Sequence, residues 1–136
     1  MIRTLTGRDR EQAVALWEAT GLTRPWNDPR ADFQRAIDSP ASAVLGWCED
    51  EAVLGTAMVG DDGHRGWVYY VAVAPSRQGQ GLGRVLMEAC EEWLRQRGAP
   101  KIQFMVRTSN EAVVAFYARL GYEAQDCLVL GRRLDA

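Results

Sequence analysis

Apolar and polar positions in the second half of the chain follow first a strand pattern and then a helix pattern. Residues Trp67 to Val73 are apolar at almost every position, as expected for a central strand with both faces buried. From Leu82 onward apolar side chains recur every three or four positions, which predicts a helix from Leu82 to Arg97 that Gly98 ends. Residues Lys101 to Val106 form a further apolar run. The order strand, helix, strand predicts a right-handed crossover between two parallel strands.

The first forty residues predict a short strand followed by two helices. Met1 to Leu5 has the pattern of a strand, and Asp9 with Gln12 resembles a capping box that opens a helix. After a loop, Pro29 suits the first turn of a second helix, which we expect to end near Ser39.

The remaining segments predict a hairpin, a last helix and closing strands. Ala43 to Cys48 and Val53 to Val59 are apolar runs separated by a charged turn, so we predict an antiparallel hairpin. Thr108 and Glu111 favour a cap for the last helix, and Tyr122 to Leu134 is expected to supply the closing strands. The inner stripe of that helix is Val113, Phe116, Tyr117 and Leu120.

Composition bounds the class of protein without naming it. With 136 residues, of which 47% are hydrophobic, the chain is long enough for one domain with a single core, and we expect residues 1–136 to form one domain. A formal net charge of −2 offers no basic face, so binding to nucleic acid is not expected. No stretch approaches the roughly 20 apolar residues that cross a bilayer. We therefore expect a cytoplasmic protein that does not bind membranes.

The cysteines do not predict a metal site. Cys48, Cys90 and Cys127 are far apart, and the chain has only one histidine to assist them. We expect buried free thiols and no metal.

A glycine-rich run before the main helix is the most specific feature of the chain. Gly79, Gly81 and Gly83 occupy alternate positions between the apolar strand and the helix. Backbone N–H groups at a helix start can bind a phosphate, and glycines let the ligand come close. The spacing does not fit the Walker loop, because Arg84 and Val85 stand where lysine and serine or threonine are required. It also does not fit the dinucleotide fingerprint, which requires Gly-x-Gly-x-x-Gly.

The run instead spells Gln78-x-x-Gly81-x-Gly83, and it resembles the acetyl-coenzyme A loop of the GNAT-type N-acetyltransferases. A second block is similar to that superfamily's later signature: Asn110, Ala112 and then Phe116-Tyr117-x-x-Leu120-Gly121-Tyr122. The resemblance covers residues 44 to 134 well. It implies an α/β (α+β) fold with a mixed, mostly antiparallel sheet of six to seven strands, a splayed parallel pair and about four flanking helices.

Two further segments, residues 24–29 and 62–66, are similar to those of small single-domain bacterial members of the superfamily whose substrates are poorly defined.

The resemblance also implies which residues bind acetyl-coenzyme A. The backbone of Val71, Ala72 and Val73 would hold the pantetheine arm. Asn110 would bond the pantetheine or cap its own helix. The alternative is that the glycines only shape a tight turn. The residues expected at the pyrophosphate or the ribose phosphate are Arg77, Gln78, Gly79, Gln80, Gly81, Leu82, Gly83 and Arg84.

Tyr117 is the candidate for the general acid, and His64 is a candidate for the base. The family places its general acid at the position of Tyr117, whose hydroxyl keeps its proton at neutral pH and can donate to the departing thiolate. The alternatives are a contact with the thiol without proton transfer, or a purely structural place in the inner stripe. Tyr117 would also contact the coenzyme. His64 has a pKa suited to a base, and the alternative, which the Gly-rich turn favours, is an exposed loop histidine.

The acceptor site is expected under the first two helices and their connecting loop. Asn27 and Asp28 are alternatives for the cap of the second helix, and Trp26 is alternatively a hydrophobic staple. Tyr69 and Tyr70 lie on the central strand, where one of them would face the substrate and could relay a proton through water. No carboxylate occupies that strand, unlike in some members of the family. The expected substrate-binding residues are Arg24, Trp26, Asn27, Asp28, Tyr69 and Tyr70.

The sequence thus predicts an enzyme that moves acetyl from acetyl-coenzyme A to a primary amine of a small metabolite, a peptide N-terminus or a lysine. The resemblance implies direct attack in a ternary complex. The alternative is a non-catalytic domain that binds or senses acyl-coenzyme A. The resemblance allows a homodimer, because closing strands in this family often join dimers, but the sequence does not fix the oligomeric state.

Overall fold

The computed structural model describes residues 1–135, which fall into two compact units. Met1–Met105 form the first unit, and the residues from Val106 onward form the second. The first unit holds the sheet and three of the helices, whereas the second holds one helix and an extended segment.

The first unit is built on a five-stranded sheet with the order β1-β2-β3-β4-β5. All neighbouring pairs are antiparallel except β4 and β5, which are parallel. This mixed, mostly antiparallel sheet confirms the predicted fold class, although the described residues form five strands and not six or seven. The strands are β1 (Ile2–Thr4), β2 (Ser42–Glu49), β3 (Ala52–Asp61), β4 (Gly66–Val73) and β5 (Ile102–Phe104).

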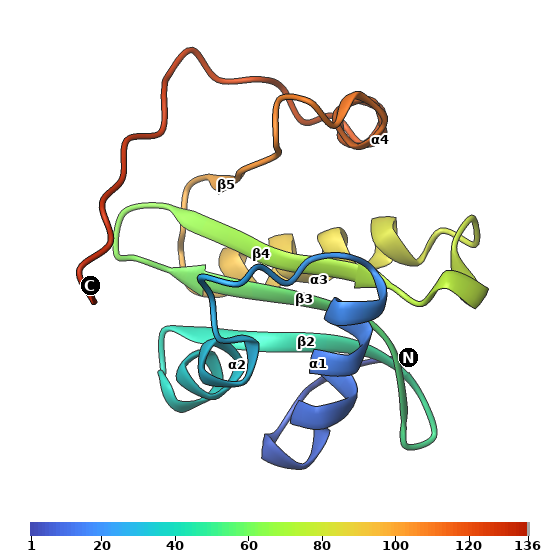
Figure 1. Ribbon diagram of the computed structural model, residues 1–136. Helices are drawn as coiled ribbons and strands as arrows, with labels where there is room; N and C mark the ends of the chain where they lie inside the picture. Colours follow the sequence, from blue (N-terminus) through green and yellow to red (C-terminus); the bar gives the residue numbers. More distant parts are fainter. Residues whose placement is uncertain (136) are drawn as a thin grey trace. The chain divides into compact units, whose positions relative to one another are not determined.

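The helices of the first unit cover both faces of the sheet (Figure 1). α1 (Arg10–Ala19) and α2 (Pro29–Asp38) lie on one face, and α3 (Leu82–Arg95) lies on the other. α3 packs so closely that a side chain at Gly66 of β4 would meet Leu94 at 2.3 Å. Two short 3-10 turns, η1 (Gly7–Asp9) and η2 (Pro75–Arg77), precede α1 and α3.

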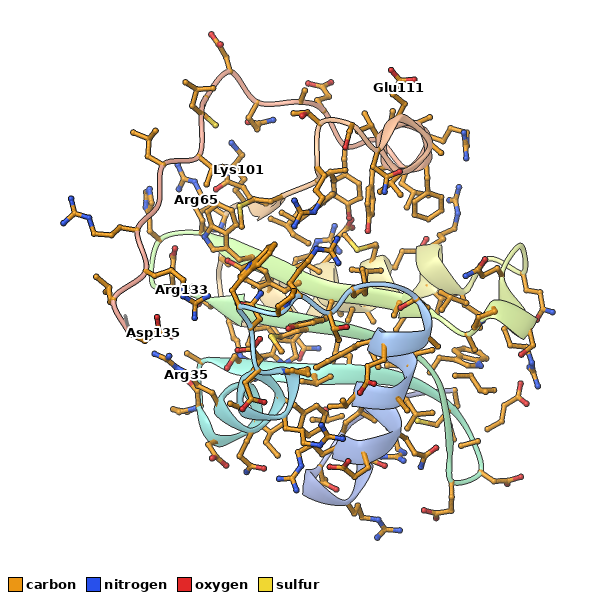
Figure 2. All side chains as sticks on the ribbon, viewed as in Figure 1. Arg35, Arg65, Lys101, Glu111, Arg133 and Asp135 are labelled. Carbon is orange, nitrogen blue, oxygen red and sulfur yellow. The ribbon has the colours of Figure 1, made fainter. Side chains whose placement is uncertain are left out.

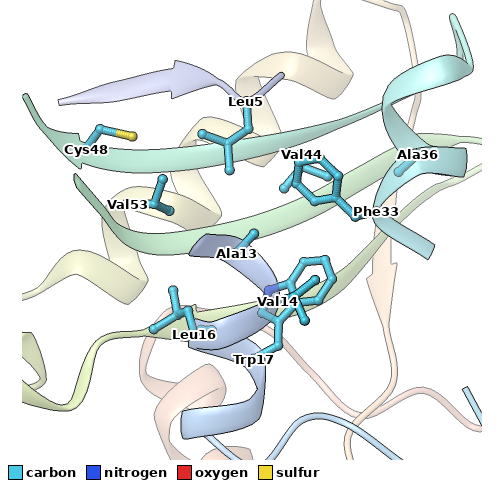
Figure 3. Close-up of a cluster of buried hydrophobic side chains, with 11 residues drawn as sticks. Leu5, Ala13, Val14, Leu16, Trp17, Phe33, Ala36, Val44, Cys48 and Val53 are labelled. Carbon is cyan, nitrogen blue, oxygen red and sulfur yellow. The ribbon is translucent and has the colours of Figure 1, made fainter. Parts of the chain in front are cut away.

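The core on the α1 and α2 face is aliphatic and aromatic (Figure 3). Trp17 of α1 and Phe33 of α2 are fully buried, and their rings lie 6.1 Å apart. Val44 and Val53 of the hairpin strands belong to the same cluster. Burying side chains of this size contributes about 1.5 to 3 kcal/mol each, so the cluster holds both helices on the sheet.

The predicted capping box of Asp9 and Gln12 is wrong, because the box forms three residues earlier, between Thr6 and Asp9. The backbone N–H of Thr6 donates to Asp9 Oδ2 at 2.9 Å, so Asp9 closes the preceding 3-10 turn. Arg3 also donates two hydrogen bonds to this buried carboxylate and holds the pKa of Asp9 at about 2. Gln12 instead donates to Glu51 O in the β2–β3 turn and accepts from Val53 N at the start of β3. Both residues therefore join the helix start to the sheet.

Three helices end in the same glycine motif. At the end of α1, Leu22 N–H donates to Trp17 O and Gly21 N–H to Glu18 O, which are the two bonds of a Schellman cap. α3 and the last helix, α4 (Glu111–Arg119), repeat this pattern at Gly98 and Gly121. All three glycines have positive φ, at 74°, 76° and 96°, and glycine adopts this conformation without strain.

The second unit contains α4 (Glu111–Arg119) but no strand among its described residues. The side chain of Asn110, and not that of Thr108, caps α4 by accepting from Val113 N at 3.3 Å. The predicted closing strands between Tyr122 and Leu134 are wrong for this structure. Leu128 and Leu130 are each 88% exposed there. An apolar run describes the propensity for a strand, but a strand forms only where a partner edge supplies hydrogen bonds.

The free cysteines differ from the expectation at one position. Cys48 and Cys90 are buried, and burial raises the pKa of the Cys90 thiol to about 12, whereas Cys127 is exposed. Within residues 1–135, the helices are all too short or too polar to span a bilayer.

Candidate functional site

The carboxyl half of β4 is open on one edge. β4 pairs with β5 only from Gly66 to Val68, where Val68 lies opposite Phe104. Val73 at the end of the strand still pairs with Gly55 of β3 on the other side. The parallel pair therefore separates after Val68. Backbone groups of Val71, Ala72 and Val73 on the β5 side are left without a strand partner in this ladder, and such an edge can pair with an amide-containing chain.

The chain then turns from β4 into α3 through a loop of open backbone (Figure 1). Gln78 Nε2 donates to Val73 O at 3.2 Å and so ties the loop to the end of the strand. Gly79 and Gly81 both have φ of 81°, and a Cβ at either position would meet nothing within 4 Å. Space for a ligand therefore lies directly against the main chain at these two positions.

The amino end of α3 suits an anion. Gly81 is its N-cap, so no side chain accepts a bond from the first turn, and no acidic residue stands in that turn. The first N–H groups of a helix lack intrahelical acceptors, and the helix dipole places partial positive charge there. A helix of 14 residues with an uncapped start after two open glycines fits a pyrophosphate. Gln80, Leu82 and Gly83 belong to the same stretch of backbone.

The two arginines next to the loop differ in their partners. Arg77 pairs with Glu49 of β2 through both guanidinium nitrogens, with Nη2 at 2.7 Å from Oε2. This arginine lowers the pKa of the Glu49 carboxyl below its usual range. Arg84 is exposed in the first turn of α3. Arg77 would have to break its ion pair with Glu49 to reach a phosphate, whereas Arg84 would not.

β4 carries a bulge at Tyr70. Thr56 lies opposite Ala72 and Met58 opposite Tyr69, so two steps along β3 match three steps along β4. Tyr70 has a φ of 53°, one of two non-glycine residues with positive φ in residues 1–135. A bulge of this kind directs two consecutive side chains to one face. Tyr69 and Tyr70 are thus both available to the α1 and α2 face, whereas strand alternation predicts only one of them there.

Tyr70 is held at three points. Its ring stacks on Trp17 with 3.9 Å between centroids and an angle of 16°. Its carbonyl accepts from the Thr56 hydroxyl at 2.9 Å, and that hydroxyl accepts from Trp17 Nε1 at 2.8 Å. Its own hydroxyl donates to Asp32 Oδ2 at 2.7 Å. Burial and the Asp32 hydrogen bond raise the pKa of Tyr70.

The residues of the predicted acceptor loop divide into structural and exposed ones. Asp28 caps α2 by accepting from Arg30 N and Ala31 N, which is the structural alternative for this residue. Arg24 donates to Gly21 O at 2.7 Å and to Thr23 O, so it braces its own loop. Trp26 is 56% exposed and Asn27 is exposed. Trp26 thus offers the largest free apolar surface of this loop.

Sequence reasoning missed Asp32. This carboxylate lies on α2 and reaches the bulge of β4 across 38 residues of sequence. One signal was present, because Asp32 follows the cap residue Asp28 by four positions and hence lies on the same side of the helix. That spacing alone gives no reason to connect it with β4.

The structure does not bring His64 to the loop that follows β4. His64 is exposed in the turn before β4, beside Arg65. Figure 2 labels Arg65 together with Lys101, whose carbonyl accepts from Gly66 N, and these residues mark the amino end of β4. Seven steps of about 3.3 Å along a strand separate that end from Val73. His64 and the glycine loop therefore lie at opposite ends of β4.

The second unit presents the other signature residues on α4. Tyr117 is half-buried, and its ring contacts those of Phe116 and Tyr122 at 5.1 Å and 6.0 Å between centroids. Tyr122 N–H donates to Tyr117 O within the Schellman cap. Asn110 adopts the capping role, one of the two expected for it.

Comparisons with known proteins agree with this geometry. The model of the Acetyltransferase (GNAT) family matches residues 11–122. Acetyltransferase YE1169 of Yersinia enterocolitica is 41% identical over 133 residues, which cover 98% of this chain and 94% of that protein. The chain belongs to the GNAT family of acetyltransferases.

Solved structures share the fold at lower identity. AAC(6')-Iy in complex with the bisubstrate analog CoA-S-monomethyl-acetylneamine superposes with a TM-score of 0.83 at 18% identity, covering 98% of this chain and 97% of that chain. A transcriptional regulator from Bacillus halodurans superposes with a TM-score of 0.82 at 21% identity, covering 98% and 99%.

The predicted family and class of enzyme are thereby confirmed. The chain is an acetyl-coenzyme A-dependent acetyltransferase, and coenzyme A chemistry fits the open glycine loop and the uncapped start of α3.

Proposed function

We propose that this enzyme transfers acetyl from acetyl-coenzyme A to a primary amine by direct attack in a ternary complex. The observation that carries the proposal is the amino end of α3, where open glycines and an uncapped first turn match a pyrophosphate. Each charge-assisted bond from an N–H group to a phosphate contributes roughly 1.5 to 3 kcal/mol. The family resemblance supplies the rest of the donor site, with the pantetheine arm along the open edge at Val71 to Val73.

In this proposal the neutral amine nitrogen attacks the thioester carbonyl carbon, the carbon–sulfur bond breaks, and the thiolate takes a proton. The nitrogen, now part of the amide, loses one proton to solvent, and solvent returns a proton to the group that protonated the thiolate. Tyr117 is the proposed donor of that proton, because a phenol with a pKa near 10 stays protonated at neutral pH and matches a thiol of about 8.5. The amine reaches the site as a neutral nucleophile, so its proton leaves to solvent before attack. β4 has no carboxylate that could serve as a base. The Tyr70 hydroxyl keeps its proton and donates a hydrogen bond to Asp32.

The acceptor is proposed to be a small amine and not a nucleic acid. AAC(6')-Iy was solved with an analog that joins coenzyme A to acetylneamine, so its fold accommodates an amino sugar beside the coenzyme. That example supports a small polyfunctional amine for this chain.

The direct test is release of free thiol from acetyl-coenzyme A in the presence of a panel of amines. We expect thiol release that depends on the amine, together with an acetylated product by mass spectrometry. Tight binding of acetyl-coenzyme A without release for any amine would instead favour a non-catalytic acyl-coenzyme A sensor.

A further inference from the structure

Asp32 places a carboxylate beside the bulge of β4 without a counter-charge. One oxygen, Oδ2, accepts from the Tyr70 hydroxyl at 2.7 Å. In the part of the chain that the structure describes, Oδ1 accepts no hydrogen bond and no cation pairs with Asp32. The residue is half-buried. A partly desolvated carboxylate with a free oxygen gains most from a cationic partner, and here the protein supplies none.

The position of this carboxylate is fixed by its neighbours. Tyr70 is clamped by ring stacking on Trp17 and by the hydroxyl of Thr56, so the phenol that holds Asp32 has little freedom. Tyr70 directly precedes Val71, where the proposed pantetheine segment begins. Asp32 is therefore held next to the strand segment that would carry the acetyl donor, on the face covered by α1 and α2.

The electrostatic surroundings of Tyr70 are negative. After burial, the Asp32 hydrogen bond and the charges of Asp32 and Asp28 raise the pKa of Tyr70. Three arginines lie closest to Asp32 in sequence, and none pairs with it within residues 1–135: Arg30 pairs with Glu11, Arg24 donates to carbonyls of its own loop, and Arg35 on α2 is exposed. The Tyr70 hydroxyl thus remains a hydrogen-bond donor to Asp32 Oδ2, and Oδ1 stays available to a ligand.

The chemistry of acetyl transfer indicates which cation this oxygen would bind. The attacking nitrogen must be neutral, and a carboxylate in direct contact with it would stabilise its ammonium form and oppose attack. A charge elsewhere on the acceptor carries no such penalty. We propose, resting on the amine acetyltransferase function above, that Asp32 is a specificity-determining residue that binds a second positive charge of the acceptor. The enzyme then selects diamines, polyamines or amino sugars over monoamines.

The test compares two acceptors of equal length, 1,4-diaminobutane and butylamine, with the intact enzyme and acetyl-coenzyme A. Wild type is expected to prefer the diamine in kcat/KM by roughly ten-fold or more, the scale of one charge-assisted hydrogen bond. Asp32→Asn keeps an oxygen for the Tyr70 hydroxyl but removes the charge, so it should erase the preference through KM of the diamine. KM for acetyl-coenzyme A should stay unchanged.

Two control variants separate charge from structure. Asp38→Asn makes the same substitution on the same helix at an exposed residue, and it should retain the preference. Tyr70→Phe keeps the ring on Trp17 but frees the carboxylate, so it should weaken the preference without erasing it. Melting temperatures of all variants establish that they are folded.

The outcomes distinguish this inference from the proposed function. Equal efficiency of wild type with both acceptors, or a preference that survives in Asp32→Asn, overturns the role of Asp32 and leaves amine acetylation intact. An equal loss for both acceptors in Asp32→Asn also overturns it, because that result describes a structural residue. Absence of turnover with every amine overturns the proposed function and this inference together.

Discussion

The two ends of the carboxyl half of β4 differ in the groups that they offer to a ligand. After Val73 the chain offers backbone, with two glycines of positive φ and the uncapped first turn of α3. At the bulge it offers side chains, with Tyr70 held between Trp17, Thr56 and Asp32. Backbone N–H groups suit a phosphate that is the same in every reaction of a family. Side chains from separate elements suit an acceptor that differs between enzymes.

If this division holds, substitutions at the glycine loop should act on the donor alone and those around Tyr70 on the acceptor alone. The strongest test is Gly83→Val. Gly83 lies within α3, so valine fits the backbone there but fills space expected for the pyrophosphate. Losing about two N–H to phosphate bonds predicts a loss of roughly 1,000-fold in affinity for coenzyme A, measured by calorimetry.

Gly7→Val provides the matched control for this substitution. Gly7 opens the 3-10 turn η1, where a Cβ meets nothing within 4 Å, and it lies away from the proposed donor site. Coenzyme A should bind this variant as it binds wild type. A folded Gly83→Val protein with unchanged affinity would remove the cradle assignment.

Tyr117→Phe tests the proposed proton donor, which belongs neither to the glycine loop nor to the surroundings of Tyr70. The ring and its contacts with Phe116 and Tyr122 persist, but the proton is gone. Turnover should fall by roughly 10- to 1,000-fold, with both Michaelis constants and the melting temperature close to wild type. Tyr122→Phe, on the neighbouring ring, should retain turnover. Wild-type kcat in Tyr117→Phe would return this residue to a packing role.

Thr56→Val tests the support beneath Tyr70. Thr56 is fully buried, and its hydroxyl joins the Trp17 indole to the Tyr70 carbonyl. Valine leaves both groups without a partner, so the free energy of unfolding should fall by about 2 kcal/mol. KM for the amine should rise, whereas coenzyme A affinity should persist. Urea unfolding measures the first effect, and Thr4→Val on the exposed edge strand serves as control. Equal weakening of both substrates would contradict two separate sites.

The smallest effect is expected from Trp26→Ala. Trp26 is 56% exposed, so its removal should cost little stability. Loss of one apolar contact predicts an increase of roughly 3- to 10-fold in KM for the amine, with KM for acetyl-coenzyme A unchanged. A fall in melting temperature without a change in KM would assign Trp26 to packing.

The strand, glycine loop and helix of the proposed donor region were predictable from sequence because their signals are local. The apolar strand, the glycine spacing and the helical periodicity from Leu82 all lie within about thirty residues. The surroundings of Tyr70 were not, although Tyr70 itself was a predicted acceptor residue, because the bulge breaks the strand alternation and its partner Asp32 lies 38 residues away. The predicted capping box of α1 was wrong for a related reason, because the Asp9 carboxylate accepts hydrogen bonds from Thr6 and Arg3. The prediction of closing strands was wrong because an apolar segment does not by itself show whether a neighbouring strand is available to pair with it.

Gly121 explains part of the family signature without reference to catalysis. It ends α4 with a φ of 96°, and the two bonds of its cap join main-chain groups. A relative that has lost acetyl transfer would still need this turn and would still display the Leu-Gly-Tyr tripeptide. Searches weighted toward that tripeptide therefore collect proteins of the same shape, active and inactive alike. Sorting them requires residues whose identity the turn does not dictate, such as Tyr117.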